Sequence, residues 1–119
     1  MRKNIKKTKL IRCGTKPMTG FYRDGYCRPG LEDYGVHTVC AKIDKRFLDF
    51  TKKEGNDLSS VVKAGQKWCL CQSRWNDAYL KNKAPYVIEK ATHSSTKKKI
   101  IKNIRVSNKK IKKSKLQKK

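Results

Sequence analysis

Charge is distributed very unevenly along this 119-residue sequence, and the distribution limits where a folded core can form. Residues 1–10 contain five basic residues, and residues 97–119 contain twelve. The central residues 11–96 hold the other 15 basic residues and all nine acidic residues, so they carry +6 of the net charge of +23. Strongly charged segments with few apolar residues bury too little surface to offset the entropy of ordering. The sequence therefore predicts a folded centre with two cationic ends.

We therefore expect a disordered basic arm over residues 1–10, an α+β domain over residues 11–106 and a disordered lysine-rich tail over residues 107–119. The length suits one small domain. No apolar run follows the basic N-terminus as in a signal peptide, and none approaches the roughly 20 residues of a membrane span. These patterns predict a cytoplasmic, reducing location, where cysteines are typically free thiols, metal ligands or redox centres rather than a disulfide frame.

The hydrophobic pattern of the centre predicts a short β-sheet. We expect strands over residues 36–43, 67–72 and 85–93, and the first of these ranges is rich in β-branched residues. A period of two places Val39 on one face of the first strand and Cys40 on the other. In the second strand the same period places Cys69 and Cys71 together, opposite Trp68.

Two to three helices are expected around this sheet. Asp44 is a typical N-cap residue, and Gly55 marks a helix end after an apolar stripe. Ser73 is the expected cap of a second helix, and Ile100 and Ile104 indicate a third segment that docks on the domain. The range 13–35 is rich in Gly, Pro and Asp, which predicts a long ordered loop before the first strand.

Five stretches of the centre occur in the same order in one known family. They read KPMTGFYRDGYC, EDYGVHTVCA, FLDFTKKEGNDLS, WCLCQSRW and APYVIEKATH, and they span roughly residues 12–95. The chain thus resembles the bacterial and plant family known as domain of unknown function 2237. The resemblance implies an α+β domain with no established activity. The chain departs from the family pattern at Tyr26, where members often have a second cysteine, and at a shortened segment over residues 60–67.

The cysteines admit several interpretations, because thiols serve as metal ligands, redox groups, nucleophiles or core residues. A zinc site needs four S or N ligands, and the predicted set is Cys27, Cys40, Cys69 and Cys71. A redox pair would use Cys69 and Cys71. For a Cys–His nucleophile, His37 and Cys40 face opposite sides of the predicted strand, whereas His93 could approach Cys69 or Cys71. Buried thiols that pack as small apolar side chains are the structural alternative.

An active cleft, if the domain has one, should gather polar residues that lie beside the glycines and cysteines of the family motifs. The candidates are Cys69, Cys71, His37, Asp57, Arg23, Asp24 and Arg74. Turn formation and capping are the structural alternative for the acidic residues. The sequence lacks the phosphate-binding G-x-x-x-x-G-K-[ST] pattern and the metalloprotease H-E-x-x-H pattern. Nucleotide hydrolysis and zinc-dependent proteolysis therefore have no support.

The lysine-rich ends predict binding to a polyanion, and nucleic acid is the first hypothesis. Lysine contacts phosphates and reads no bases there, so this binding would be independent of sequence. Codon bias in an A/T-rich genome is the alternative origin of the lysines, and such ends also suit a protein packed with a genome in a nucleoid or virus particle. A small thiol- or metal-dependent enzyme is the second hypothesis. The predicted contacts are Lys3, Lys6, Lys7, Lys97, Lys98, Lys99, Lys109, Lys110, Lys112 and Lys113.

Overall fold

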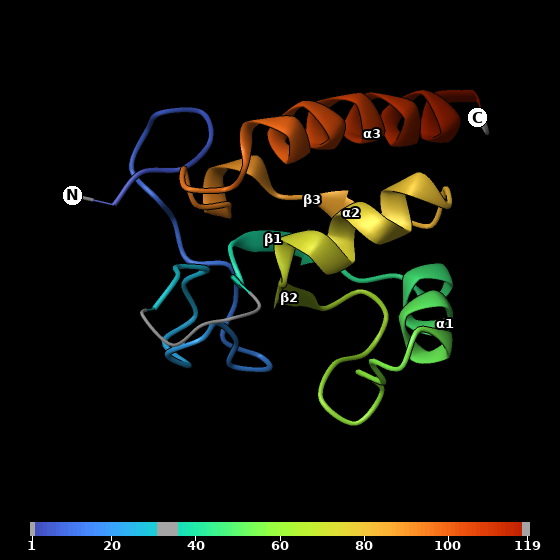
Figure 1. The fold of residues 1–119 in the computed structure, drawn as a ribbon, viewed down its shortest axis with the longest axis horizontal. Helices are drawn as coiled ribbons and strands as arrows, with labels where there is room; N and C mark the ends of the chain where they lie inside the picture. The colour runs from blue at the N-terminus through green and yellow to red at the C-terminus, as the bar shows by residue number, and fades with distance from the viewer. Residues whose placement is uncertain (1, 31–35, 118–119) are drawn as a thin grey trace.

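Short alternating segments form a three-stranded antiparallel sheet in the computed structural model, which describes residues 2–30 and 36–117. The central strand is β1 (Val39–Lys42), and it pairs with β2 (Lys67–Leu70) and with β3 (Tyr86–Val87). All three expected strands exist, but each is shorter than predicted. The third range gives only two strand residues and continues into a 3₁₀ turn at Glu89–Ala91. The sheet and its helices confirm the α+β class (Figure 1).

The two faces of the sheet bury different chemistry. Val39 lies in the main core, where Phe47 and Trp75 are also fully buried. Cys40 is opposite Cys69 in the register of β1 and β2, and both belong to a second buried cluster with other cysteines. The alternation expected from the sequence is therefore confirmed for β1, and it explains how cysteines gather on one face.

The first two helices follow the strands directly. In α1 (Lys45–Lys53), the Asp44 carboxylate accepts the Phe47 N–H at 2.7 Å, so the expected N-cap is confirmed. Gly55 follows this helix with φ of +88°, a conformation that glycine adopts without strain. In α2 (Gln72–Leu80), Cys71 occupies the N-cap position that the sequence analysis gave to Ser73. The second strand therefore ends one residue before Cys71.

The longest helix, α3 (Lys98–Gln117), includes residues 107–117 of the range 107–119, where the sequence predicted disorder; residues 118–119 lie outside the described part of the chain. Its buried face contains Ile100 and Ile104 and then the polar residues Ser107 and Asn108. The Asn108 amide pairs with the backbone of Val87, accepting its N–H at 3.0 Å and donating to its carbonyl at 2.9 Å. The sequence prediction of disorder rested on the small number of apolar residues in this range. It did not include this contact, because the contact is made by hydrogen bonds to the edge strand β3.

Residues 1–10 were expected to be disordered, but residues 2–10 form a small ordered hairpin, which we call the arm; Met1 lies outside the described part of the chain. Lys3 pairs with Lys9 in an antiparallel bridge, and Ile5 and Leu10 are buried. Asn4 is fully buried and donates to the carbonyl oxygens of Lys9 and Lys90 at 3.1 and 3.0 Å. One buried amide and two apolar side chains thus fix a cationic segment. Figure 1 shows the arm beside the first turns of α3.

Candidate functional site

An open cleft of about 750 Å³ lies where β2 ends and α2 begins, and we call it the thiol cleft. Four separate parts of the chain supply its walls: the loop before β1, the turn at His37, the segment after α1 and the β2–α2 junction. Aromatic, cationic and acidic side chains meet there with one free thiol. The lining residues are Phe21, Arg23, His37, Asn56, Asp57, Leu58, Val61, Trp68, Cys69, Leu70, Cys71 and Arg74.

A strained turn connects the His37 wall to the start of α2. Val36 has φ of +50°, which is an outlier for a β-branched residue. Its carbonyl accepts the N–H of Thr38 at 2.9 Å and the N–H of Gln72 at 3.1 Å. The second bond satisfies an N–H in the first turn of α2 and holds the turn against this helix. Strain of about 1–3 kcal/mol is tolerated where surrounding contacts fix the conformation, and such positions cluster at functional sites.

The cleft thiol belongs to Cys71, which is partly exposed and is the free cysteine among the described residues. Its Sγ atom lies 3.1 Å from the hydroxyl oxygen of Ser73. Because Cys71 is the N-cap of α2, its side chain sits at the end of the helix where unpaired N–H groups point outward. The thiol is therefore placed where an incoming anionic or polarised group meets favourable dipoles.

Two arginines flank this thiol. The Arg23 guanidinium donates to the Gly20 carbonyl at 2.7 Å and lies 5.3 Å from the centre of a Trp68 ring. Arg74 donates to the Glu54 carbonyl at 3.3 Å. Each of these bonds uses one of five guanidinium N–H donors, so both groups retain capacity for a ligand oxygen.

Asp57 is the acidic residue of the lining, and its own turn holds its carboxylate. The Ser59 hydroxyl and the Ser59 N–H, the latter at 2.9 Å, donate to it and lower the pKa of Asp57 below its ordinary value. Asp57 is therefore an ionised acceptor at neutral pH. This fits a positioning or charge-balancing role better than proton donation.

Six of the seven predicted catalytic candidates line the thiol cleft, and Asp24 does not. Asp24 forms an ion pair with Arg28 at 2.8 Å. Burial raises the pKa of Asp24, but hydrogen bonds from Tyr26 and Arg28 and the Arg28 charge outweigh it, so the net pKa is lowered. Asp24 is thus a structural residue of the loop. The aromatic walls Phe21 and Trp68 were not predicted as cleft residues, because aromatic residues in a small domain are first assigned to the core.

Behind the cleft, four cysteines form two disulfides, Cys13–Cys40 and Cys27–Cys69. The expectation of free thiols is therefore wrong for four of the five cysteines. The register of β1 and β2 places Cys40 beside Cys69 on one face. The long loop crosses that face and brings a partner to each. Paired disulfides are typical of an oxidising compartment, so they do not favour the reducing location that the sequence indicated.

These four residues form a compact group, which we call the sulfur cluster. The Sγ atoms of Cys13, Cys27 and Cys69 lie within 4.8 Å of one another, and Cys40 is bonded to Cys13. All four residues are at most 2% exposed. The predicted metal set contained Cys71 in place of Cys13. Cys71 lies outside the sulfur cluster, because β2 ends before it. Cys13, from the loop before β1, is the fourth member of the cluster instead. No spacing signal in the sequence connects Cys13 to the other three.

A second surface feature lies between the arm and α3, and we call it the cationic groove. It has a volume of about 440 Å³, and no carboxylate is present among the described residues that line it. Arg105 fixes the two walls together, donating to the Ile5 carbonyl at 3.1 Å while its Nε lies 3.7 Å from a Glu89 carboxylate oxygen. Its cationic lining residues are Lys7, Lys98, Lys102, Arg105 and Lys109.

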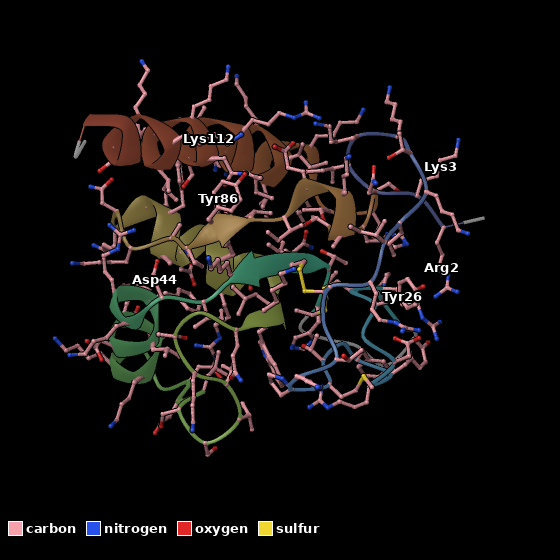
Figure 2. The ribbon with its side chains drawn as sticks, turned by 180° about the vertical axis from the view of Figure 1, so that it is seen from behind. Arg2, Lys3, Tyr26, Asp44, Tyr86 and Lys112 are labelled. Carbon is pink, nitrogen blue, oxygen red and sulfur yellow. A yellow bond between two sulfur atoms is a disulfide. The ribbon has the colours of Figure 1, made fainter. Side chains whose placement is uncertain are left out.

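The ten lysines predicted to contact nucleic acid are all exposed, and three of them line the cationic groove. Lys7, Lys98 and Lys109 line the cationic groove. Lys112 lies on another side of α3, with its Nζ 5.9 Å from the Tyr86 ring centre. Figure 2 shows Lys112 near Tyr86 and nitrogen-tipped side chains along the outer edge of α3 and around the arm. Lys102 and Arg105 are groove residues that the prediction omitted, since it skipped the middle of the helix.

No helix among the described residues is both long enough and apolar enough to cross a membrane. The fold and these surfaces define a small α+β protein with a disulfide-bonded loop and a cationic helix. The family model described as "Uncharacterized protein conserved in bacteria (DUF2237)" matches residues 3–108, so the chain belongs to this family. No curated protein matches the chain. The match includes the arm and the first half of α3. The five sequence stretches that first indicated the family covered only about residues 12–95 and so left both segments out.

Proposed function

We propose that the protein binds nucleic acid without sequence preference through the cationic groove. The observation that supports this is the convergence of five cationic side chains from the arm and α3 on one groove. Phosphates are spaced regularly along nucleic acid, and a row of fixed cations binds them with release of counterions. The groove has few groups suited to reading base edges, so it favours contacts to the backbone.

The electrostatic setting strengthens this proposal. The sequence of α3 contains no Asp or Glu, and the whole chain carries a net charge of +23. Glu89 balances only part of the Arg105 charge, because their atoms are 3.7 Å apart and both side chains are partly exposed. A cationic protein of this kind attracts a polyanion over a distance, and the groove then fixes where the backbone lies.

The salt dependence of binding tests the proposal quantitatively. If the five groove cations each contact a phosphate, the slope of log K against log salt is about −4.5 for a duplex. Replacing Lys98, Lys102 and Lys109 by Gln should make the slope shallower by about 2.7. Fluorescence anisotropy with a labelled random-sequence duplex between 50 and 300 mM salt measures both values.

A matched control removes the same charge elsewhere. Lys45, Lys63 and Lys83 are exposed and lie outside the groove, so their joint replacement by Gln should change the slope by less than about 1. Equal effects of the two triple variants would show that the whole surface charge, and not the groove, determines binding. An unchanged slope in the groove variant would reject the proposal directly.

The thiol cleft supports a second candidate function, because a free thiol and two arginines meet there with an ionised acid. We propose that it binds a small organic anion, which Arg23 and Arg74 hold beside the Cys71 sulfur. Trp68 supplies a flat apolar wall for the body of such a molecule. This arrangement would place an electrophilic atom of the ligand within reach of a nucleophile.

Alkylation rates distinguish an anion-binding cleft from an ordinary exposed thiol. Iodoacetate carries a carboxylate and iodoacetamide does not, while both form the same S–C bond with loss of iodide. We expect Arg74→Gln to lower the iodoacetate-to-iodoacetamide rate ratio at Cys71 several-fold. Arg46→Gln, which removes an exposed charge outside the cleft, should leave the ratio unchanged. A ratio insensitive to Arg74 would exclude the candidate.

A further inference from the structure

We propose that the sulfur cluster is a redox-controlled metal site, in which the four cysteines of the two disulfides bind one zinc ion after reduction. The three sulfurs that lie within 4.8 Å of one another, together with the bonded fourth, already occupy a space of metal-site size. Zinc–sulfur bonds of about 2.3 Å place tetrahedral ligands about 3.8 Å apart. The proposal therefore needs the sulfurs to move by about an ångström or more, which rotation of the cysteine side chains would supply.

The backbone that carries these cysteines is fixed without the disulfides. The Cys40 N–H donates to the Thr92 hydroxyl at 3.1 Å, and the Cys69 N–H donates to the Thr19 hydroxyl at 2.9 Å. Both threonines are fully buried. The β1–β2 register holds the same two cysteines side by side. Reduction thus leaves at least two ligands in place on a rigid sheet.

The loop cysteines also have anchors of their own. The Cys13 N–H donates to the Gly25 carbonyl at 2.7 Å, which connects the two ends of the loop that carries Cys13 and Cys27. Cys27 pairs in a parallel bridge with Thr92. Gly25 has φ of +88°, and a Cβ there would lie 2.8 Å from the Gly14 carbonyl, so the loop is closely packed. Both loop sulfurs therefore stay near the sheet when the disulfides open.

The donor set selects the metal. Four thiolates in a water-excluded site favour zinc or a similarly soft divalent ion over magnesium or calcium, which prefer oxygen ligands. A tetrathiolate zinc centre has a net charge of −2, and the large positive charge of the protein stabilises it.

The chemical steps balance with a dithiol as the reductant. Two molecules of dithiol each transfer two electrons and two protons to one protein disulfide, giving four cysteine thiols and two oxidised dithiols. The four thiols then bind one Zn²⁺ and release four protons. In the reverse direction, two molecules of a small-molecule disulfide accept four electrons and four protons, leave as four thiols, re-form the two protein disulfides and so release the Zn²⁺ ion. The loop is connected to the sheet in both states, either by two covalent bonds or by the metal.

Cobalt binding by the full-length protein tests the site, because tetrahedral cobalt–thiolate centres have intense visible and near-ultraviolet bands. After anaerobic reduction by a phosphine, we expect about one Co²⁺ per chain, displaced by Zn²⁺. The oxidised protein should bind none. In a thiol assay the oxidised protein should expose one reactive thiol, the reduced protein five, and the reduced zinc form one, that of Cys71.

Matched serine variants assign the ligands. Cys71→Ser should leave cobalt affinity within about twofold of the parent value, because Cys71 is outside the cluster. Cys13→Ser should weaken it at least about tenfold, since even loss of an outer-shell contact weakens metal sites by 10–100-fold. If Cys13→Ser does not fold, zinc protection of four thiols in the unmodified protein decides the matter. Five reactive thiols in the presence of zinc, or dependence of the cobalt bands on Cys71, would overturn the proposal.

Discussion

The substitution Asn108→Asp probes whether the cationic end of the chain is part of the folded domain. The Asn108 side chain is 4% exposed, accepts the Val87 N–H and donates to the Val87 carbonyl. An aspartate keeps the shape and the acceptor but replaces the donor by a charged oxygen that faces a carbonyl. Loss of the buried bond leaves that carbonyl unsatisfied at a cost of about 1–3 kcal/mol, and burial of the carboxylate adds to it. We expect a total loss of about 3 kcal/mol.

Thermal and urea unfolding measure this loss. A destabilisation of about 3 kcal/mol should lower the melting temperature by roughly 10–15 °C in a chain of this size. Because a protonated carboxyl regains a donor, the difference from the parent protein should shrink as the pH is lowered toward 4. Recovery on acidification is a result that simple loss of packing would not produce.

The same substitution at Asn103 provides the control. Asn103 is on the same helix and donates to the Asn76 side-chain oxygen at 2.8 Å. The Asn76 amide can rotate to present its NH₂ group, so Asn103→Asp should cost less than about 1 kcal/mol. If the two variants are equally stable, the end of α3 is not docked through Asn108.

Three further outcomes are expected. Asp44→Ala should destabilise the protein by about 1 kcal/mol in urea unfolding through loss of the α1 cap, whereas Asp49→Ala, at an exposed position of the same helix, should cost less than about 0.5 kcal/mol. Burial and the nearby Arg2 charge lower the pKa of His93, so the unfolded state binds more protons. Stability should therefore fall as the pH drops from above 6.5 through the folded-state pKa, and His93→Gln should flatten this dependence. Without reductant, one thiol per chain should react with a maleimide, and mass mapping should place it on Cys71.

Local sequence signals predicted the features that depend on a few neighbouring residues. Asp44 caps α1 because its side chain meets an N–H only three positions along the chain. The two faces of β1 follow from a period of two, whatever the rest of the fold does. Most cleft residues were also predicted, because polar residues beside the glycines and cysteines of the family motifs were taken as one set of candidates. Their shared cleft was not predictable in the same way, because the Val36 carbonyl that joins the His37 turn to the start of α2 has no local sequence signal.

Features that depend on distant contacts were not predictable in this way. Cys13 joins the sulfur cluster because a loop folds back across β1, and loop paths have no periodic signal. The arm looked disordered because four of its residues are lysines, yet one buried amide at Asn4 satisfies three acceptors. In both cases a single residue with a specific partner outweighs the average composition of its segment.

The charge of α3 explains why its order depends on the rest of the molecule. Two pairs of lysines lie one helical turn apart in α3, namely Lys98 with Lys102 and Lys109 with Lys113. Repulsion within each pair destabilises an isolated helix by about 0.2–0.5 kcal/mol. Burial of Ile104 and the Asn108 contacts offset this repulsion. A bound phosphate backbone would remove the repulsion while leaving those contacts intact. The same lysines that weaken the free helix therefore favour its bound form, which couples the stability of the domain to occupation of the cationic groove.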